Sequence, residues 1–190
     1  MDRRTDIVVV GAGHAGCEAA AAAARMGQRV TMLSLKADQI GRLSCNPAIG
    51  GLAKGNLVRE LDALGGLMAK VADASTVQFR ILNTRKGLAV RSSRAQVDID
   101  VYPKKMRETL SKIPNLQFVE GEVVALLHEN AKVTGVALGD GSTLQCRAVI
   151  LTTGTFLGGL LHCGDKAEVG GRVGEEAAHA LADSLRDIGL

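Results

Sequence analysis

The sequence predicts an α/β fold built around a parallel, Rossmann-like sheet. Three observations predict it. Residues 6–10 form a continuous β-branched run, which is typical of a strand buried on both faces. Residues 18–26 are rich in alanine and favour a helix that ends at Gly27. Residues 29–34 predict a second strand, so that strand, glycine-rich turn, helix and strand fit the roughly 30 residues of a βαβ unit.

Composition limits what else the chain can be. It has 190 residues, 46% of them hydrophobic, which is enough for one domain with a core. A net charge of +3 excludes a highly basic tail, and four aromatic residues argue against stacking of single-stranded nucleic acid. No apolar stretch reaches the roughly 18 residues of a membrane span. The spacings of the four cysteines match no zinc template, so we expect no metal site, free thiols and a cytoplasmic protein.

The turn after the first strand has the pattern of a dinucleotide-binding loop. Gly11 allows a tight turn, Gly13 allows the backbone to approach a pyrophosphate, and Gly16 allows the helix to pack closely on the sheet. The helix N-terminus then presents free N–H groups to the phosphates. The acidic residue expected at the end of the second strand is missing, because Ser34 occupies its position. The ribose contact is therefore left open.

The middle of the chain reads as an insertion over about residues 37–94. Glycines and Pro47 indicate a loop that includes Gly55, followed by a helix from Asn56, the expected N-cap, to Ala63. Residues 77–82 predict a strand. Residues 95–112 predict a helix that Pro103 kinks or restarts.

The last third predicts a β-meander that leads back to the cofactor. Short strands are expected over 116–119, 122–127, 133–138, 143–146 and 148–152, with a hairpin turn at Asp140-Gly141. The strand and small-residue turn at 148–154 resemble the second signature of two-dinucleotide-binding flavoproteins. Together with the glycine turn, this favours FAD over NAD. A final amphipathic helix is expected over 175–186.

Two further features carry chemistry in the sequence. Cys45 lies in a loop constrained by Pro47, Gly50 and Gly51, where it is either a nucleophile or a small buried residue that packs the turn. Residues 80–107 carry eight basic side chains against two acidic ones, a net charge of +6. This segment is either an anion-binding face for a nucleic acid or cofactor, or a solvated surface.

Several motifs together closely resemble the MnmG (GidA) family. They are Gly11-Ala-Gly-His-Ala-Gly-Cys-Glu-Ala-Ala20, Ser44-Cys-Asn-Pro-Ala-Ile-Gly-Gly51, Asp62-Ala-Leu-Gly-Gly-Leu-Met-Ala-Lys70, Gln78-Phe-Arg-Ile-Leu-Asn83, Arg94-Ala-Gln96 and Gly154-Thr-Phe-Leu157. The similarity covers essentially the whole chain, and the cysteine loop is its most specific part.

The resemblance implies an FAD-dependent enzyme that modifies tRNA. With the GTPase MnmE, family members add a carboxymethylaminomethyl group to carbon 5 of the wobble uridine, using methylenetetrahydrofolate and NADH, and they form homodimers. By motif, the FAD pyrophosphate would be held by Gly11, Ala12, Gly13, His14, Ala15 and Gly16. Val123 would contact the adenine end through its backbone, and Cys45 would act in the chemistry. From charge, we expect Arg85, Lys86, Arg91 and Arg94 to face the tRNA.

The sequence departs from the family pattern in three ways. Leu88 replaces a family proline, and Ala178 falls where a family serine contacts FAD. The family is also much longer, so we expect an incomplete FAD-binding domain that lacks the C-terminal domains and is inactive by itself. Two alternatives stay open: a relative of the flavin- and folate-dependent tRNA uridine methyltransferases, or a non-catalytic FAD-binding fragment.

Overall fold

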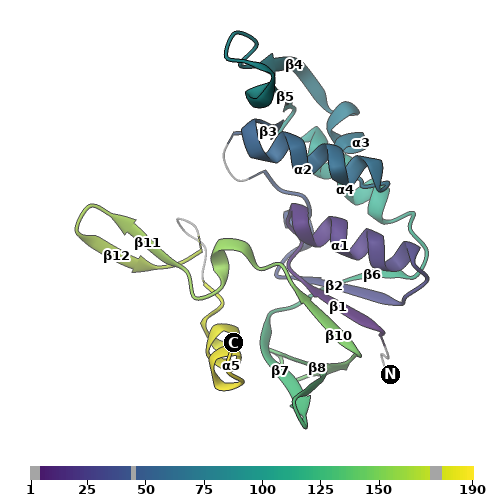
Figure 1. Ribbon diagram of the computed structural model, residues 1–190. Helices are drawn as coiled ribbons and strands as arrows, with labels where there is room; N and C mark the ends of the chain where they lie inside the picture. Colours follow the sequence, from purple (N-terminus) through teal and green to yellow (C-terminus); the bar gives the residue numbers. More distant parts are fainter. Residues whose placement is uncertain (1–4, 44–45, 172–176) are drawn as a thin grey trace.

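A computed structural model describes residues 5–43, 46–171 and 177–190. Its centre is a parallel sheet with the strand order β10-β1-β2-β6 (Figure 1). The strands are β1 (Ile7–Val10), β2 (Val30–Ser34), β6 (Leu116–Glu120) and β10 (Ala148–Leu151). The helix α1 (His14–Arg25) connects β1 to β2, as the βαβ pattern predicts.

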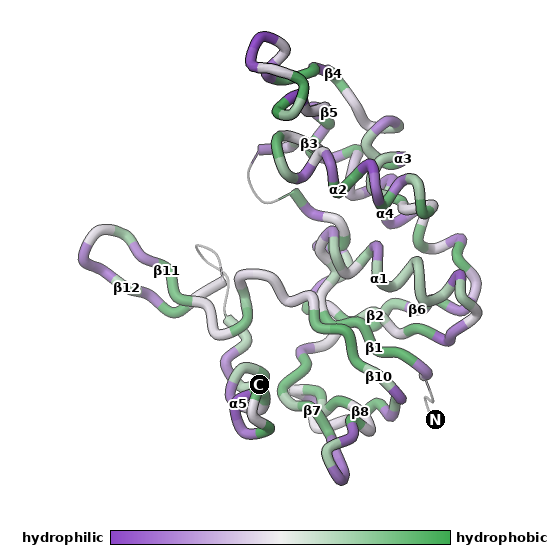
Figure 2. The backbone as a smooth tube through the Cα atoms, viewed as in Figure 1, coloured by the Kyte–Doolittle hydropathy of each residue, from purple (hydrophilic) through white to green (hydrophobic). Residues whose placement is uncertain are grey.

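Both faces of this sheet are covered, which explains the continuous apolar run in β1. Val9 packs with α1 in one core, whereas Val8 and Val10 face a second core. The second core is completed by the antiparallel meander β7 (Val123–Glu129), β8 (Lys132–Leu138) and β9 (Thr143–Gln145), and by α5 (His179–Asp187). In Figure 2, β1 and β10 accordingly have the green of the hydrophobic end of the scale. The predicted strand, helix and meander in these regions are confirmed within a few residues.

A second, smaller sheet lies between β2 and β6 in the sequence. Its strand order is β3-β5-β4, with β3 (Ala48–Gly50), β5 (Ser92–Val97) and β4 (Thr76–Leu82). Two helices, α2 (Leu52–Ala63) and α3 (Met68–Asp73), pack with it, and α4 (Val101–Leu110) leads back to the central sheet (Figure 1). The β4–β5 pair extends from the body of the molecule as an arm, which we call the β4–β5 arm.

Two predictions in this region are wrong. The helix expected from residue 95 begins only at Val101, because β5 pairs with β3 and β4 on its two edges. Pro103 therefore lies in the first turn of α4, where its missing N–H costs no hydrogen bond. The helix expected from Asn56 begins at Leu52, and its N-cap is Gly51. Gly55 is a helix residue, and a Cβ there would lie 2.4 Å from the Ser92 hydroxyl, so the glycine allows α2 to approach β5.

A second hairpin, which the sequence did not indicate, follows the central sheet. Strands β11 (Leu160–Cys163) and β12 (Lys166–Val169) pair antiparallel and extend away from the body (Figure 1). The helix α5 begins at His179, later than the predicted start at residue 175, and residues 172–176 lie outside the described part of the chain. Across the described ranges, no helix is long and apolar enough to cross a membrane.

Candidate dinucleotide-binding site

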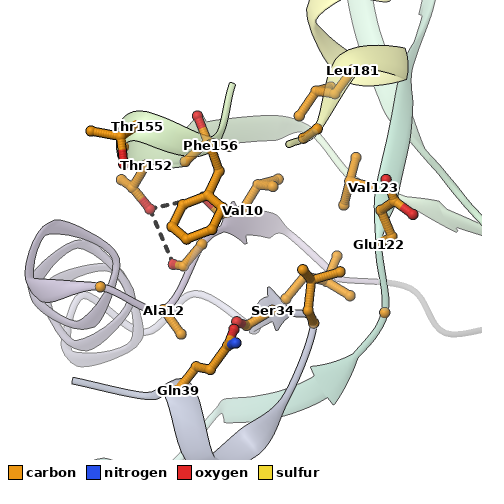
Figure 3. A pocket seen from close by; sticks show the side chains of 18 of the residues that line it. Val10, Ala12, Ser34, Gln39, Glu122, Val123, Thr152, Thr155, Phe156 and Leu181 are labelled. Carbon is orange, nitrogen blue, oxygen red and sulfur yellow. Dashed lines mark hydrogen bonds between the residues drawn. The ribbon is translucent and has the colours of Figure 1, made fainter. Parts of the chain in front are cut away.

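A pocket of about 410 Å³ opens at the carboxyl ends of the parallel strands. This is the edge at which ligands bind in open α/β sheets. Its walls come from the β1–α1 turn, the end of β2, the β6–β7 connection, the loop after β10 and the start of α5 (Figure 3). The described lining residues are Val10, Gly11, Ala12, Gly13, Leu33, Ser34, Leu35, Gln39, Arg42, Gly121, Glu122, Val123, Thr152, Thr153, Gly154, Thr155, Phe156, Ala177, Ala178 and Leu181.

The glycine turn has the geometry that its sequence predicts. Gly11 has a φ of 104°, a backbone conformation that residues with a side chain rarely adopt. A Cβ on Gly16 would lie only 1.9 Å from the Gly11 carbonyl oxygen, whereas a Cβ on Gly13 would meet nothing within 4 Å. Gly16 therefore closes helix α1 against the turn. Gly13 leaves open backbone that a phosphate can approach, at a helix end whose first N–H groups have no helical partner.

The loop after β10 is fastened to the same turn. The Thr152 hydroxyl lies 2.8 Å from the Val10 carbonyl oxygen and 3.1 Å from that of Gly11 (Figure 3, dashed lines). The Thr152 backbone N–H also donates to Val10, at 2.8 Å. The turn that follows the strand at 148–151 thus forms one wall of the pocket.

The side chains of the other turn residues point elsewhere. His14 packs edge-on against the ring of Tyr102, with ring centroids 5.6 Å apart. Burial and the neighbouring Lys54 charge lower the pKa of His14 to about 4, so its ring is neutral near pH 7. Ala15 is exposed. Any contact of His14 or Ala15 with a phosphate in the pocket would therefore use the backbone N–H.

Other positions expected to contact the cofactor also line the pocket. Val123 is buried at the start of β7, and Ser34 ends β2. Ala178 lies on the pocket wall, and its backbone N–H donates to the Phe156 carbonyl oxygen at 2.8 Å. These positions fit a dinucleotide whose phosphates lie at the β1–α1 turn and whose adenosine lies toward β2 and β6.

Comparison with protein families identifies the chain. The family model described as glucose inhibited division protein A, GidA, matches residues 6–190. The chain belongs to the GidA family. The resemblance carried by its motifs is therefore confirmed.

Similar proteins agree with this assignment. The chain is 53% identical over 190 residues to the tRNA uridine 5-carboxymethylaminomethyl modification enzyme MnmG of Myxococcus xanthus, covering 100% of this chain and 31% of that protein. The structure of Aquifex aeolicus GidA matches with a TM-score of 0.90 and 50% identity, covering 97% of this chain and 31% of that one. The chain thus spans about a third of the length of these relatives.

The fold extends to more distant flavoproteins. PqsL of Pseudomonas aeruginosa, described as a probable FAD-dependent monooxygenase, has a TM-score of 0.54 at 18% identity, covering 77% of this chain and 41% of that one. This likeness concerns the fold alone. With the GidA match, it confirms the predicted Rossmann-like α/β fold of the FAD-binding flavoprotein type.

Cys45 of this GidA-family chain lies outside the described residues, but the segments on both sides of its loop are placed. On one side, the Gly41 N–H donates to the Ala12 carbonyl oxygen at 2.9 Å, and Arg42 lines the pocket. On the other side, the Val97 N–H donates to the Pro47 carbonyl oxygen at 2.8 Å. The described residues before the loop therefore lie beside the glycine turn, and those after it are joined to the small sheet.

Cys17 offers a contrast to a reactive cysteine. Its side chain is fully buried, and its thiol lies 3.4 Å from the Ala12 carbonyl oxygen. Burial raises the pKa of Cys17 to about 12. Because the thiolate is the nucleophile, Cys17 is a packing residue of α1.

The structure divides the basic segment between two places. Lys104, Lys105 and Arg107 lie on α4, where Lys105 pairs with Glu108 at 3.2 Å. The others lie on the β4–β5 arm: Arg80, Arg85, Lys86, Arg91 and Arg94. Of the four residues expected to face tRNA, three lie around the connection between the strands, and Arg94 lies further down β5.

The connection between the arm strands contains Leu88, the position of the family proline. Gly87 has a φ of 100°, and Leu88–Val90 form a single 3₁₀ turn. The Arg91 guanidinium donates to the Thr84 carbonyl oxygen at 3.0 Å, across the connection. The segment is therefore ordered without proline.

Glu18 is a structural residue that the sequence analysis did not single out. It lies on α1 with 8% of its surface exposed. Its carboxylate accepts hydrogen bonds from the backbone N–H groups of Leu67, at 2.8 and 3.1 Å, and of Met68, at 2.5 Å. It thereby caps α3, whose own N-cap residue supplies no side-chain hydrogen bond. In the sequence, only its position as a charged residue in an alanine-rich helix indicates this role.

Proposed function

We propose that this chain is the FAD-binding part of an enzyme that modifies tRNA at the wobble uridine. One observation carries the proposal: a pocket lined by the glycine turn lies at the carboxyl ends of the parallel strands, in a chain that belongs to the GidA family. The relatives named as tRNA uridine 5-carboxymethylaminomethyl modification enzymes support the substrate and the transferred group. The parent activity would be the addition of that group to carbon 5 of the uridine.

In this proposal, the pocket residues hold FAD by its phosphates and adenosine. Residues 11–16 surround the pyrophosphate, which the free N–H groups of the first turn of α1 face and to which Gly13 gives room. The Gly11 N–H is not among them, because it donates to the Leu33 carbonyl oxygen at 2.8 Å. Val123 contacts the adenine end, and Ala178 offers FAD no side-chain hydrogen bond. Bound FAD would supply electron transfer. The same proposal includes further features that rest on the family resemblance. These are methylenetetrahydrofolate and NADH as co-substrates, the GTPase MnmE as partner, a homodimer and a cytoplasmic setting.

Cys45 is the proposed catalytic residue. Its loop begins at the hydrogen bond between Gly41 and Ala12, beside the cofactor turn. A cysteine thiolate is suited to attack carbon 6 of the uracil ring, which would make carbon 5 nucleophilic. Handling a one-carbon group carried by the flavin is a second possible role for the same thiol.

The first experiment separates cofactor binding from chemistry. The purified protein should retain the flavin absorbance bands after incubation with FAD and removal of unbound flavin by gel filtration. Cys45→Ser in the enzyme that contains this chain should keep these bands and lose wobble-uridine modification. A protein that never takes up FAD would contradict the cofactor assignment, and unchanged modification in Cys45→Ser would contradict the catalytic one.

The β4–β5 arm is the proposed tRNA-facing surface. Arg85 and Lys86 are exposed in its connection. Arg80 lies directly opposite Arg94 in the β4–β5 register. Opposed like charges destabilise a strand pair, and a bound phosphate would remove that cost.

Removing two charges from the arm should weaken tRNA binding. We expect Arg85→Gln with Lys86→Gln to lower the affinity for an unmodified tRNA transcript about tenfold and to reduce the salt slope by about 2, one for each lost phosphate contact. Filter binding over a salt series measures both quantities. The matched control, Lys104→Gln with Lys112→Gln, removes two exposed charges near α4. Equal losses in the two double variants would mean that binding follows net charge and would overturn the arm assignment.

A further inference from the structure

A carboxylate is missing where a Rossmann-type pocket normally binds the adenosine ribose. The acid usually follows the second strand, and Ser34 stands there. A serine can share one hydrogen bond with a ribose hydroxyl, but it brings no charged acceptor. A carboxylate at this end of the pocket would therefore have to come from another element of the chain.

The neighbouring strand supplies two candidates. In the parallel register, Ser34 lies beside Glu120 of β6. Glu120 is already engaged, because its carboxylate accepts a hydrogen bond from the Ala37 N–H at 2.6 Å and thereby holds the chain that follows β2. Glu122 lies two residues further on. Among the described residues that line the pocket, it carries the only carboxylate.

The backbone of Glu122 is held in place from both sides. The preceding residue, Gly121, donates its N–H to the Ser34 carbonyl oxygen at 3.0 Å, which fastens the β6–β7 connection to the end of β2. The Glu122 carbonyl oxygen accepts from the Gly139 N–H at 2.9 Å. A Cβ on Gly139 would lie 3.6 Å from the Glu122 carboxylate, an ordinary van der Waals contact, so this acid lies beside the turn that follows β8. Figure 3 shows Glu122 next to Val123, on the far side of the pocket from Thr152.

The strand order places Glu122 at the adenosine end. In the order β10-β1-β2-β6, Thr152 follows one outer strand and Glu122 follows the other, with the glycine turn after β1 between them. A dinucleotide that places its pyrophosphate at this turn extends its adenosine over β2 toward β6. The residue that ends β2 and the acid that follows β6 then face the same sugar.

We infer that Glu122 replaces the missing acid and accepts hydrogen bonds from the 2′- and 3′-hydroxyls of the adenosine ribose, with Ser34 beside it. The inference rests on the proposed dinucleotide function of the pocket. In the usual dinucleotide-binding pattern, this contact comes from the residue at the end of the second strand, here β2. In this chain it would come from Glu122, which follows β6, the third strand of the central sheet in sequence order.

Nucleotide fragments test this assignment without any activity of the loaded enzyme. We expect Glu122→Ala to weaken ADP binding by the purified protein at least about tenfold, since the loss of even one of the two charge-assisted hydrogen bonds has about that effect. It should leave the binding of 2′,3′-dideoxy-ADP unchanged, and Glu122→Gln should be intermediate for ADP. Isothermal titration calorimetry measures all three. Glu129→Gln, at the far end of β7, is the matched control and should behave as the unchanged protein.

The outcomes separate the inference from the function beneath it. If Glu122→Ala binds ADP as tightly as the unchanged protein, Glu122 does not contact the nucleotide. If it loses ADP and dideoxy-ADP affinity equally, the residue acts on the base or the fold, and the ribose assignment is wrong. If the unchanged protein binds neither ADP nor FAD, the proposed dinucleotide function fails as well.

Discussion

Gly16→Ala is expected to prevent stable folding of the nucleotide-binding unit. The added methyl group would lie 1.9 Å from the Gly11 carbonyl oxygen and 2.8 Å from the Thr152 hydroxyl. The nearer of these two partners is backbone of the β1–α1 turn, which cannot rotate away as a side chain can. We expect a loss of at least about 3 kcal/mol in the free energy of unfolding, at the upper end for an overpacked site. Urea denaturation followed by circular dichroism measures it.

Gly13→Ala is the matched control, in the same turn. A methyl group there meets nothing within 4 Å, and the glycine has a φ of −70°, which alanine readily adopts. We expect unchanged unfolding but at least about tenfold weaker FAD binding, because the methyl group would occupy the approach of the pyrophosphate. A Gly16→Ala protein that unfolds like the Gly13→Ala protein would contradict the tight helix–turn contact.

Glu18→Ala should cost about 3 kcal/mol of stability although it places alanine, the best helix former, inside a helix. The substitution leaves the buried N–H groups of Leu67 and Met68 without acceptors, and each such group costs about 1–3 kcal/mol. Thermal unfolding measures the loss. Hydrogen exchange should show the first amides of α3 exposed before those of α1.

An exposed glutamate provides the comparison for Glu18. Glu60→Ala, on the solvent side of α2, makes the same chemical change in a helix and should alter stability by less than about 0.5 kcal/mol. Glu18→Gln should lie between the two, because an amide oxygen can still accept from one backbone N–H. If Glu18→Ala were as mild as Glu60→Ala, the capping of α3 from α1 would not be an important contact.

Much of the central fold could be predicted from local sequence. A βαβ unit begins with a buried strand, a tight turn and a helix. The chain provides these as the β-branched run at 7–10, the three glycines and the alanine-rich helix, which are all close together in the sequence. The Asp140-Gly141 turn likewise predicts the β8–β9 hairpin. In the βαβ unit and the β8–β9 hairpin, where neighbouring residues decide the conformation, the prediction and the structure agree.

The small sheet could not be predicted in the same way. Its central strand, Ser92–Val97, has small and polar residues with no regular apolar alternation, and it is a strand because β3 and β4 pair with its two edges. Gly55 reads as a loop residue, but it belongs to a helix that must approach this strand. The contacts of Glu18 join segments 49 and 50 residues apart, and no local pattern contains them.

The pocket has a consequence for synthesis of the protein. Its walls come from segments scattered between Val10 and Leu181, and the Thr152 hydroxyl reaches back 142 residues to the Val10 carbonyl oxygen. The glycine turn leaves the ribosome early, but β10 and α5 emerge only near the end of the described chain. Since domains fold as units, the nascent turn stays without its last walls until Leu181 has emerged. A cofactor can therefore bind in the complete pocket only after the residues up to Leu181 have been synthesised.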